Sequence, residues 1–293
     1  MSRRSFGILL IIPLAFSLSG CASLLFYPDQ TMRLTPKTLG LEYEDVNLTT
    51  PDGVKLHGWF LSAQNEPRGT IFFLHGNAEN ISTHIHSVAW LPGQGYQVFL
   101  LDYRGYGLSE GSPDLPDVLT DVATGFRWLL SEPRVADRDL YLLGQSLGAT
   151  LGAYFVGANP EARARLSAIV LDAPFASYRE LTREKLALFP VTWPLQYPLS
   201  LLMPDDYSPI KNIAKLSPLP LLIICSETDD IVPARHSAAL FEAAGEPKAL
   251  WITRGPHIGT FGQENNRRRV LTFLEEYKRN ASPAVGAPTT RTK

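Results

Sequence analysis

Apolar residues fall into short runs along the chain, separated by longer stretches in which apolar and polar positions alternate with helical spacing. Several of the runs are apolar at consecutive positions, which is typical of parallel strands buried on both faces of a sheet. The first two runs are joined by Pro51-Asp52-Gly53, a turn signal. These patterns predict eight strands, at 44–50, 54–61, 70–74, 97–101, 139–143, 168–172, 220–225 and 248–252.

The stretches between the runs carry apolar stripes at the spacing of an amphipathic helix. Ser208-Pro209 has the serine and first-turn proline that are typical of a helix start. Strands that alternate with helices predict the α/β class, with an eight-stranded, mostly parallel sheet and helices on both faces. The two clearest stripes are formed by Val118, Val122, Phe126 and Leu129 and by Val270, Leu274 and Tyr277.

More than forty residues separate the sixth predicted strand from the seventh, which leaves room for a small cap at about 175–207. The segment is rich in apolar side chains, Trp193 among them, and it is interrupted by four prolines. Such a flap could form an apolar wall over a binding site and exclude water, or it could pack as a short helix on the body of the protein. The sequence favours neither interpretation over the other.

The first residues have the pattern of a secretory signal. Arg3 and Arg4 are followed by an apolar run over 6–16, which is too short to span a membrane as a helix. Leu18-Ser19-Gly20-Cys21 resembles a bacterial lipobox, which predicts lipidation of Cys21 after cleavage; the alternative is an ordinary signal peptide with an incidental cysteine. No aspartate follows Cys21, and in enteric-type bacteria this favours the outer membrane, facing the periplasm.

The chain divides into four predicted parts. They are a signal peptide over 1–20, a tether with some docking capacity over 21–41, one α/β domain over 42–280 and a disordered tail over 281–293. The tail is rich in Pro, Ala and Thr, a composition that cannot bury a core.

Charge and cysteine content exclude several classes of partner. The formal charge of −2 becomes −4 when Arg3 and Arg4 are removed, so nothing favours nucleic acid. Cys225 is the only cysteine besides Cys21, so no intrachain disulfide can form once Cys21 is lipidated. No histidines and cysteines stand at metal-ligand spacing, and we predict neither a metal nor a cofactor.

The apolar run 140–143 leads directly into Gly144-Gln145-Ser146-Leu147-Gly148, and a small-residue helix pattern follows. A serine on such a sharp strand-to-helix turn, a nucleophile elbow, has a strained backbone and a hydroxyl that stands clear of the sheet. The flanking glycines remove side chains that would collide where strand and helix meet. Ser146 is therefore the predicted nucleophile.

A serine hydroxyl becomes a good nucleophile when a histidine accepts its proton and a carboxylate orients that histidine. Two histidines follow Ser146. His236 lies in a helical pattern and is interpreted as an exposed helix residue. His257 lies in a Gly/Pro-rich loop after the strand at 248–252, where catalytic residues are commonly held, and it is the predicted base.

Two carboxylates follow strand ends between Ser146 and His257. Asp229 comes from the strand just before the histidine's own strand, which favours it as the orienting acid. Asp172 is the competing candidate; if Asp229 is the acid, Asp172 is expected to be a structural carboxylate that accepts hydrogen bonds from loop amides. Asp230 is interpreted as a solvated residue or the start of the next helix.

Acyl transfer also requires N–H donors for the oxyanion that forms on the attacked carbonyl. The backbone N–H of Leu147, at the start of a helix, is one predicted donor. The loop His75-Gly76-Asn77-Ala78 follows an early strand, and the backbone N–H of Asn77 is the predicted second donor. His75 precedes the serine in the chain and is expected to shape this loop by a hydrogen bond.

Five motifs in this order resemble the α/β-hydrolase superfamily over roughly residues 42–280. The nearer likeness is to small-capped serine hydrolases of the α/β-hydrolase-domain, serine-aminopeptidase and monoglyceride-lipase kind. The resemblance implies an α/β-hydrolase fold and a Ser146-His257-Asp229 triad, with Asn77 and Leu147 as oxyanion donors. The motifs are His75-Gly76-Asn77-Ala78, Leu101-Asp102-Tyr103-Arg104-Gly105-Tyr106-Gly107, Gly144-Gln145-Ser146-Leu147-Gly148, Asp229-Asp230-Ile231-Val232-Pro233 and Pro256-His257.

The histidine loop departs from the pattern of the superfamily. Pro256 and Ile258 stand where members often have a second glycine and a small polar residue. This departure bears on the shape of the loop and leaves the assignment of His257 unchanged.

The sequence thus predicts a serine hydrolase that cleaves carboxylic esters or thioesters through an acyl-enzyme. The substrate is expected to be a small acyl ester or a lipid-like molecule, met at a membrane through the anchor at Cys21. The alternatives are a peptidase or amidase with the same triad, an acyltransferase, and a non-catalytic binding lipoprotein. The last of these would be expected to have lost a triad residue, and none is missing.

Overall fold

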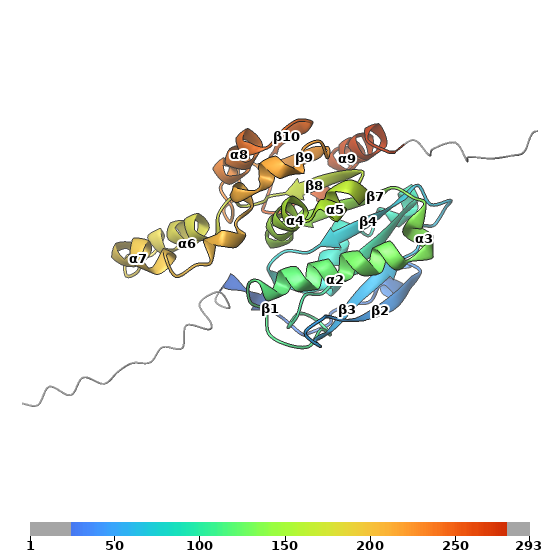
Figure 1. Cartoon of the computed structure of the whole chain (residues 1–293), viewed down its shortest axis with the longest axis horizontal. Helices are drawn as coiled ribbons and strands as arrows, with labels where there is room; N and C mark the ends of the chain where they lie inside the picture. The colour runs from blue at the N-terminus through green and yellow to red at the C-terminus, as the bar shows by residue number, and fades with distance from the viewer. Residues whose placement is uncertain (1–24, 280–293) are drawn as a thin grey trace, which may run out of the picture.

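A computed structural model of the chain describes residues 25–279 (Figure 1). The strands of its main sheet are β2 (Tyr43–Thr49), β3 (Lys55–Leu61), β4 (Gly69–Leu74), β6 (Tyr96–Leu101), β7 (Leu140–Gln145), β8 (Ala168–Asp172), β9 (Leu221–Ser226) and β10 (Lys248–Thr253). Their order across the sheet is β10-β9-β8-β7-β4-β6-β3-β2. The pairs β2–β3 and β3–β6 are antiparallel, and the other neighbours are parallel.

All eight strands lie within one or two residues of the ranges that the apolar runs predict. Both faces of the central strands are buried, which explains why the runs are continuously apolar. On β4, Phe72 and Leu74 pack into one apolar cluster, whereas Ile71 and Phe73 pack into a second cluster on the opposite face. The predicted eight-stranded, mostly parallel sheet is therefore confirmed.

Helices cover both faces of this sheet, as the alternation of elements predicts. Helices α2, α4 and α8 contribute to the first cluster, and α1 and α9 contribute to the second. The predicted stripe on α2 is buried against the sheet, where the helix runs across the strands (Figure 1). The helices are α1 (Ile81–His84), α2 (Asp117–Ser131), α3 (Pro133–Ala136), α4 (Leu147–Ala158), α5 (Pro160–Arg165), α6 (Tyr178–Ala187), α7 (Gln196–Ser200), α8 (Ala234–Ala243) and α9 (Glu264–Glu276).

The segment between β8 and β9 forms a small cap, as predicted. It contains α6, the short 3-10 helix η5 (Trp193–Leu195) and α7, and it projects from the body of the molecule (Figure 1). The base of the cap is closed by Asp205, whose Oδ1 accepts hydrogen bonds from Ser177 Oγ and Ser208 Oγ at 2.6 Å each. The Ser208-Pro209 signal yields only a three-residue 3-10 helix, η7 (Pro209–Lys211), because the Ser208 hydroxyl accepts from the backbone N–H of Tyr178 instead of capping that turn.

The tip of the cap differs from both interpretations of the sequence. Its large apolar side chains are exposed rather than packed on the body, with Trp193 60% and Val191 83% exposed. Packing is confined to the root of the cap, where Tyr178 is buried and Leu181 is partly buried against the first cluster.

Part of the predicted tether is held on the body. Strand β1 (Tyr27–Pro28) pairs in parallel with β5 (Ala78–Glu79), and Phe26 is buried. The predicted signal peptide, the Cys21 site and the predicted tail over 281–293 lie outside the described residues. Between residues 25 and 279, none of the helices combines the length and apolarity that crossing a membrane would require.

Candidate active site

Ser146 lies at the turn between β7 and α4, as the elbow motif predicts. Its backbone has φ 51° and ψ −115°, a conformation that a non-glycine residue adopts only under strain. A Cβ on Gly148 would lie 2.1 Å from Leu74 O, and a Cβ on Gly144 would lie 2.6 Å from Ala149 Cα. The two glycines are therefore required for the close approach of strand and helix.

His257 and Asp229 come together on neighbouring loops, as predicted. His257 Nδ1 lies 2.7 Å from Asp229 Oδ2, and the Asp229 side chain is 1% exposed. An ionised carboxylate only accepts hydrogen bonds, so Nδ1 carries the proton and Nε2 of neutral His257 carries the lone pair. Burial opposes the charge of Asp229, but the bond from His257 and those from the backbone N–H groups of Val232 and Ile231 outweigh it and lower the pKa of the carboxyl.

Residues next to Ser146 and His257 join the two loops. Gln145 Nε2 donates to Ile258 O at 3.4 Å. The backbone N–H of Ser146 donates to Asp172 O at 2.8 Å, which joins the elbow to the end of β8. Among the described residues Ser146 Oγ forms no side-chain hydrogen bond, and the residue is 8% exposed. The serine hydroxyl is thus unengaged, beside the loop that holds the histidine.

Asp172 is expected to be a structural carboxylate if Asp229 is the acid, and its partners are not the loop amides that the sequence suggested. Oδ2 accepts from Gln145 Nε2 and Oδ1 accepts from Thr260 Oγ1, at 2.8 Å each. Burial raises the pKa of Asp172 to about 6, because these neutral donors only partly compensate the charge. Asp172 therefore stabilises the two loops beneath Ser146 and His257.

The two predicted oxyanion donors lie on either side of the elbow. Leu147 is the first residue of α4, where the N–H group has no partner within the helix. Asn77 precedes β5, and its neighbour Gly76 is close enough that a Cβ there would lie 3.7 Å from Ser146 Cβ. Among the described residues outside the regular elements, Asn77 N–H donates to no backbone carbonyl.

The side chain of Asn77 has a role that the sequence did not reveal. Its Oδ1 accepts from the backbone N–H of Tyr27 at 3.0 Å and from Tyr106 Oη at 2.9 Å, and its Nδ2 donates to Leu25 O. The segment before the main domain is thus fastened to the same loop that presents the Asn77 N–H. No local sequence pattern predicts this contact, because it joins residues about fifty positions apart.

His75 shapes the loop by a hydrogen bond, as expected. Its Nδ1 donates to Gly76 O at 2.7 Å, and its ring stacks on Tyr103 at 4.4 Å. Burial lowers the pKa of His75 well below its usual value and raises the pKa of Asp102 to about 8, so both groups are neutral at pH 7. The two lie 3.5 Å apart beneath the loop, as an uncharged pair.

His236 and His84 differ from what the sequence indicated. His236 was expected to be exposed, but it is 1% exposed, because Glu184 on α6 lies over it with Oε2 3.1 Å from His236 Nε2. The missing information is the partner on the cap, which a helical pattern cannot show. His84 was not singled out; its Nε2 donates to Ala78 O at 2.9 Å, beside the Asn77 loop.

Backbone strain is concentrated around this edge of the sheet. Among the described residues, four non-glycine residues have positive φ, and each lies within two residues of Asn77, Ser146, Asp172 or His257. Ile258, which replaces the small polar residue of the superfamily pattern, adopts φ 51°, a costly value for a β-branched side chain. Such strain persists where surrounding structure enforces it, which is typical of functional sites. The four residues are Glu79, Ser146, Ala173 and Ile258.

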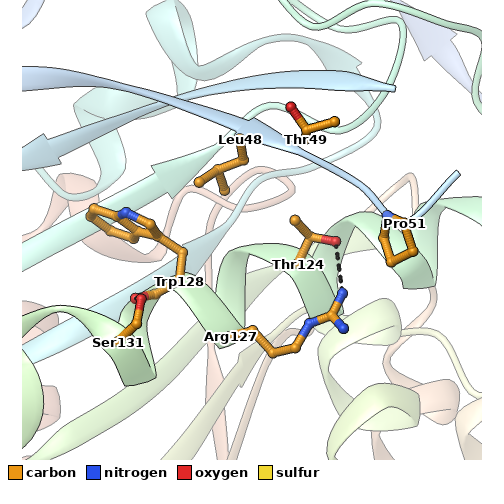
Figure 2. Close-up of a pocket in the computed structure, with 7 residues that line it drawn as sticks. All are labelled: Leu48, Thr49, Pro51, Thr124, Arg127, Trp128 and Ser131. Carbon is orange, nitrogen blue, oxygen red and sulfur yellow. Dashed lines mark hydrogen bonds between the residues drawn. The ribbon is translucent and has the colours of Figure 1, made fainter. Parts of the chain in front are cut away.

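An open cavity of about 410 Å³ lies elsewhere, between β2 and α2 (Figure 2). Thr124 and Arg127 are hydrogen-bonded to each other on one wall, and Leu48 and Trp128 contribute apolar surface. Strand β2 is at the edge of the sheet, separated from β7 by three strands. None of the predicted site residues lines this cavity.

Comparison with known proteins identifies the class to which this fold and site belong. The sequence pattern of the family described as "Serine aminopeptidase, S33" matches residues 65–205. YfhR of Escherichia coli K12 is 34% identical over 239 residues, which cover 79% of this chain and 80% of that protein. The α/β hydrolase domain-containing protein WAV2 of Arabidopsis thaliana is 32% identical over 258 residues, 83% of this chain and 82% of that protein.

Solved structures with a similar fold are also α/β hydrolases or esterases. The Pyrococcus furiosus esterase Pf2001 aligns with a TM-score of 0.69 and 25% identity, over 86% of this chain and 98% of that one. The α/β hydrolase GrgF of Penicillium aligns with a TM-score of 0.65 over 81% of this chain and 99% of that one. The chain belongs to the α/β-hydrolase superfamily.

Proposed function

We propose that the protein is a serine hydrolase in which Ser146 attacks the carbonyl of an ester or thioester, with His257 as base and Asp229 as its orienting acid. The observation that carries this proposal is the 2.7 Å contact between His257 Nδ1 and buried Asp229, next to a serine held at φ 51°. The α/β-hydrolase superfamily supplies the same order of groups along the chain.

The chemistry follows from the protonation states. With its Nδ1 proton held by Asp229, His257 accepts the Ser146 proton at Nε2 as Oγ forms a bond to the carbonyl carbon. The oxyanion is stabilised by the N–H groups of Leu147 and Asn77. His257 then gives its proton to the departing alcohol or thiol, which leaves an acyl group on Ser146. Water, deprotonated by His257, releases the acid and restores the serine.

Labelling with a fluorophosphonate, which reacts with activated serines, tests the nucleophile. The full chain should be labelled, and Ser146→Ala should lose labelling and several orders of magnitude in kcat for a short-chain ester while remaining folded. Ser131→Ala, at an exposed serine at the end of α2, is the matched control and should behave like the parent. Undiminished labelling of Ser146→Ala would refute the assignment.

Ester cleavage is favoured by the likeness to the Pyrococcus furiosus esterase, and peptide cleavage is the second candidate because the matching family is described as serine aminopeptidase. We expect higher kcat/KM for short-to-medium acyl esters than for acetate esters, since each buried methylene contributes up to about 0.8 kcal/mol. We expect little cleavage of peptide amides. Efficient cleavage of aminoacyl amides, with esters no better, would favour the peptidase.

We also propose that Cys21 is lipidated and that the protein is anchored at the outer membrane, facing the periplasm. The support is the lipobox-like Leu18-Ser19-Gly20-Cys21 after a short apolar run. Labelled palmitate should be incorporated into the parent and lost in Cys21→Ser, and membrane fractionation should place the parent with the outer membrane. Palmitate incorporation that is unchanged in Cys21→Ser would refute lipidation at this residue.

A further inference from the structure

The tip of the cap is apolar, exposed and free of charge. Residues 186–204 contain no Asp, Glu, Lys, Arg or His. Soluble proteins rarely expose contiguous apolar surface of this kind unless it meets a partner or a membrane. The exposed side chains are Leu188, Phe189, Val191, Trp193, Leu195, Tyr197, Leu201 and Leu202, and we refer to these eight as the cap patch.

The cap patch belongs to a hairpin whose root is fixed. On the body side, Glu184 contacts His236 and Arg235, and Lys185 Nζ donates to Asp230 O at 3.4 Å. Asp230 follows the proposed acid directly, so the root of the cap adjoins the proposed active site. Glu184 and Lys185 therefore face the body, whereas Arg183 lies over the ring of Tyr197, with its Cζ 5.5 Å from the ring centroid. The tip beyond α6 carries no charged residue and is presented to solvent.

The amino-terminal end of the described chain points to the same side. Strand β1 and the cap lie toward the same end of the long axis of the molecule, opposite to the carboxyl-terminal end (Figure 1). Cys21 precedes Leu25 by four residues, which span at most about 14 Å. Leu25 itself is fastened to Asn77. A membrane that holds Cys21 would thus lie at the end of the molecule from which the cap projects.

We propose that the cap patch docks on a lipid membrane, where its side chains enter the interfacial region and turn the proposed active site toward the lipid. The docking does not depend on the proposed chemistry; only the orientation of the site rests on the proposed function. Tryptophan and tyrosine favour the membrane–water interface, and leucine, phenylalanine and valine favour its apolar side. Charged side chains are costly to place among acyl chains, so a tip without charge fits this contact.

Trp193 reports directly on this contact. The full chain is reconstituted on phosphatidylcholine vesicles whose acyl chains are brominated, and its fluorescence is compared with that on ordinary vesicles. Bromine quenches tryptophans that reach the acyl region, so we expect substantial quenching that is mostly lost in Trp193→Phe. Of the other four tryptophans, Trp59 and Trp251 are buried, and Trp90 and Trp128 are partly buried against the two apolar clusters of the body. Equal fractional quenching of the parent and Trp193→Phe would overturn the proposal.

A substitution at the tip separates docking from chemistry. Phe189→Glu should raise the KM for a long-chain ester dissolved in vesicles by about tenfold and leave kcat/KM for a soluble short-chain ester unchanged. Ile252→Glu, at an exposed apolar side chain on β10, is the matched control and should change neither value. If Phe189→Glu also leaves the vesicle reaction unchanged, the cap patch does not dock.

The same preparations distinguish the other outcomes. If the parent hydrolyses no ester but Trp193 is still quenched, the proposed function fails while docking stands. If Trp193 is not quenched and light scattering shows that the parent is a dimer that Phe189→Glu dissociates, the patch is an interface between two copies. That result would overturn the lipid proposal.

Discussion

At the carboxyl edge of the sheet, a Cβ added to Gly148 would lie 2.1 Å from Leu74 O, whereas the side chain of Val191 at the tip of the cap is 83% exposed. The edge is fixed by close packing from strands, helices and a strained backbone. The cap is attached only at its base, by a few polar contacts and by the packing of Tyr178 and Leu181. The contrast indicates two different roles. The close-packed edge of the sheet positions the proposed catalytic groups, and the exposed cap is available for contact with a partner.

The largest expected effect concerns the edge. Asp229→Asn leaves the shape of the site intact but lets His257 adopt the wrong tautomer, so we expect kcat to fall about 10⁴-fold. Asp230→Asn, at the exposed neighbour, should retain parental activity. Ester hydrolysis and circular dichroism measure activity and folding. If Asp172→Asn is folded and inactive while Asp229→Asn is active, the acid has been assigned to the wrong residue.

A pair of leucines tests the contrast in stability. Leu142 on β7 is fully buried, and Leu142→Ala should lower the free energy of unfolding by about 2–5 kcal/mol. Leu188 in the cap patch is 67% exposed, and Leu188→Ala should change it by less than about 0.5 kcal/mol. Urea denaturation measures both values. A large loss for Leu188→Ala would mean that the cap packs on the body in solution.

The buried carboxyl of Asp102 predicts a pH dependence of stability. Unfolded aspartate loses its proton near pH 4, whereas the pKa of about 8 keeps Asp102 protonated in the folded state. Between these two pH values the folded state binds one proton more than the unfolded state. The free energy of unfolding therefore falls as pH rises, by up to about 1.4 kcal/mol per pH unit. Asp102→Asn should remove this contribution.

Urea denaturation at several pH values tests this prediction. The difference in free energy of unfolding between Asp102→Asn and the parent should grow in favour of the variant from pH 5 to pH 8. A difference that stays constant over this range would show that the Asp102 carboxyl is ionised in the folded protein.

The smallest expected effect on the stability of the whole molecule concerns the hydrogen bonds to Asp205 at the base of the cap. Asp205→Ala removes the acceptor of Ser177, Ser208 and the Arg179 N–H. We therefore expect the free energy of opening the cap locally to fall by about 1–3 kcal/mol. Limited proteolysis within 186–204 should accelerate several-fold, with the global unfolding midpoint almost unchanged. Asp206→Ala, whose side chain is 91% exposed, is the control. Equal cleavage rates in the two variants would show that Asp205 does not hold the cap.

The sheet was predictable because its signal is local. The run 168–171 is apolar at every position, and burial on both faces of a parallel sheet requires this pattern. The elbow was predictable because Gly144 and Gly148 stand two residues before and two after Ser146, although the atom that requires Gly148 is Leu74 O on β4.

What the sequence could not predict depends on distant partners. The periodicity around His236 gives no sign of Glu184, which buries it from the cap, and nothing near Asn77 indicates that Leu25 and Tyr27 bind its side chain. The exposure of the cap patch could not be predicted from the sequence either. Apolar residues broken by prolines can pack or protrude with the same sequence, and the outcome depends on the surface available nearby.

The closure of both ends of the cap on Asp205 has an evolutionary consequence. Ser177 and Ser208 meet at one carboxylate, so the hairpin leaves and rejoins the body of the protein at almost the same place. The entropy of closing a loop rises only slowly with its length, so the hairpin can be lengthened or replaced with little change in the stability of the strands on either side. The cap can therefore change in sequence and length during evolution, and with it the surface that the protein recognises, while the sheet stays the same.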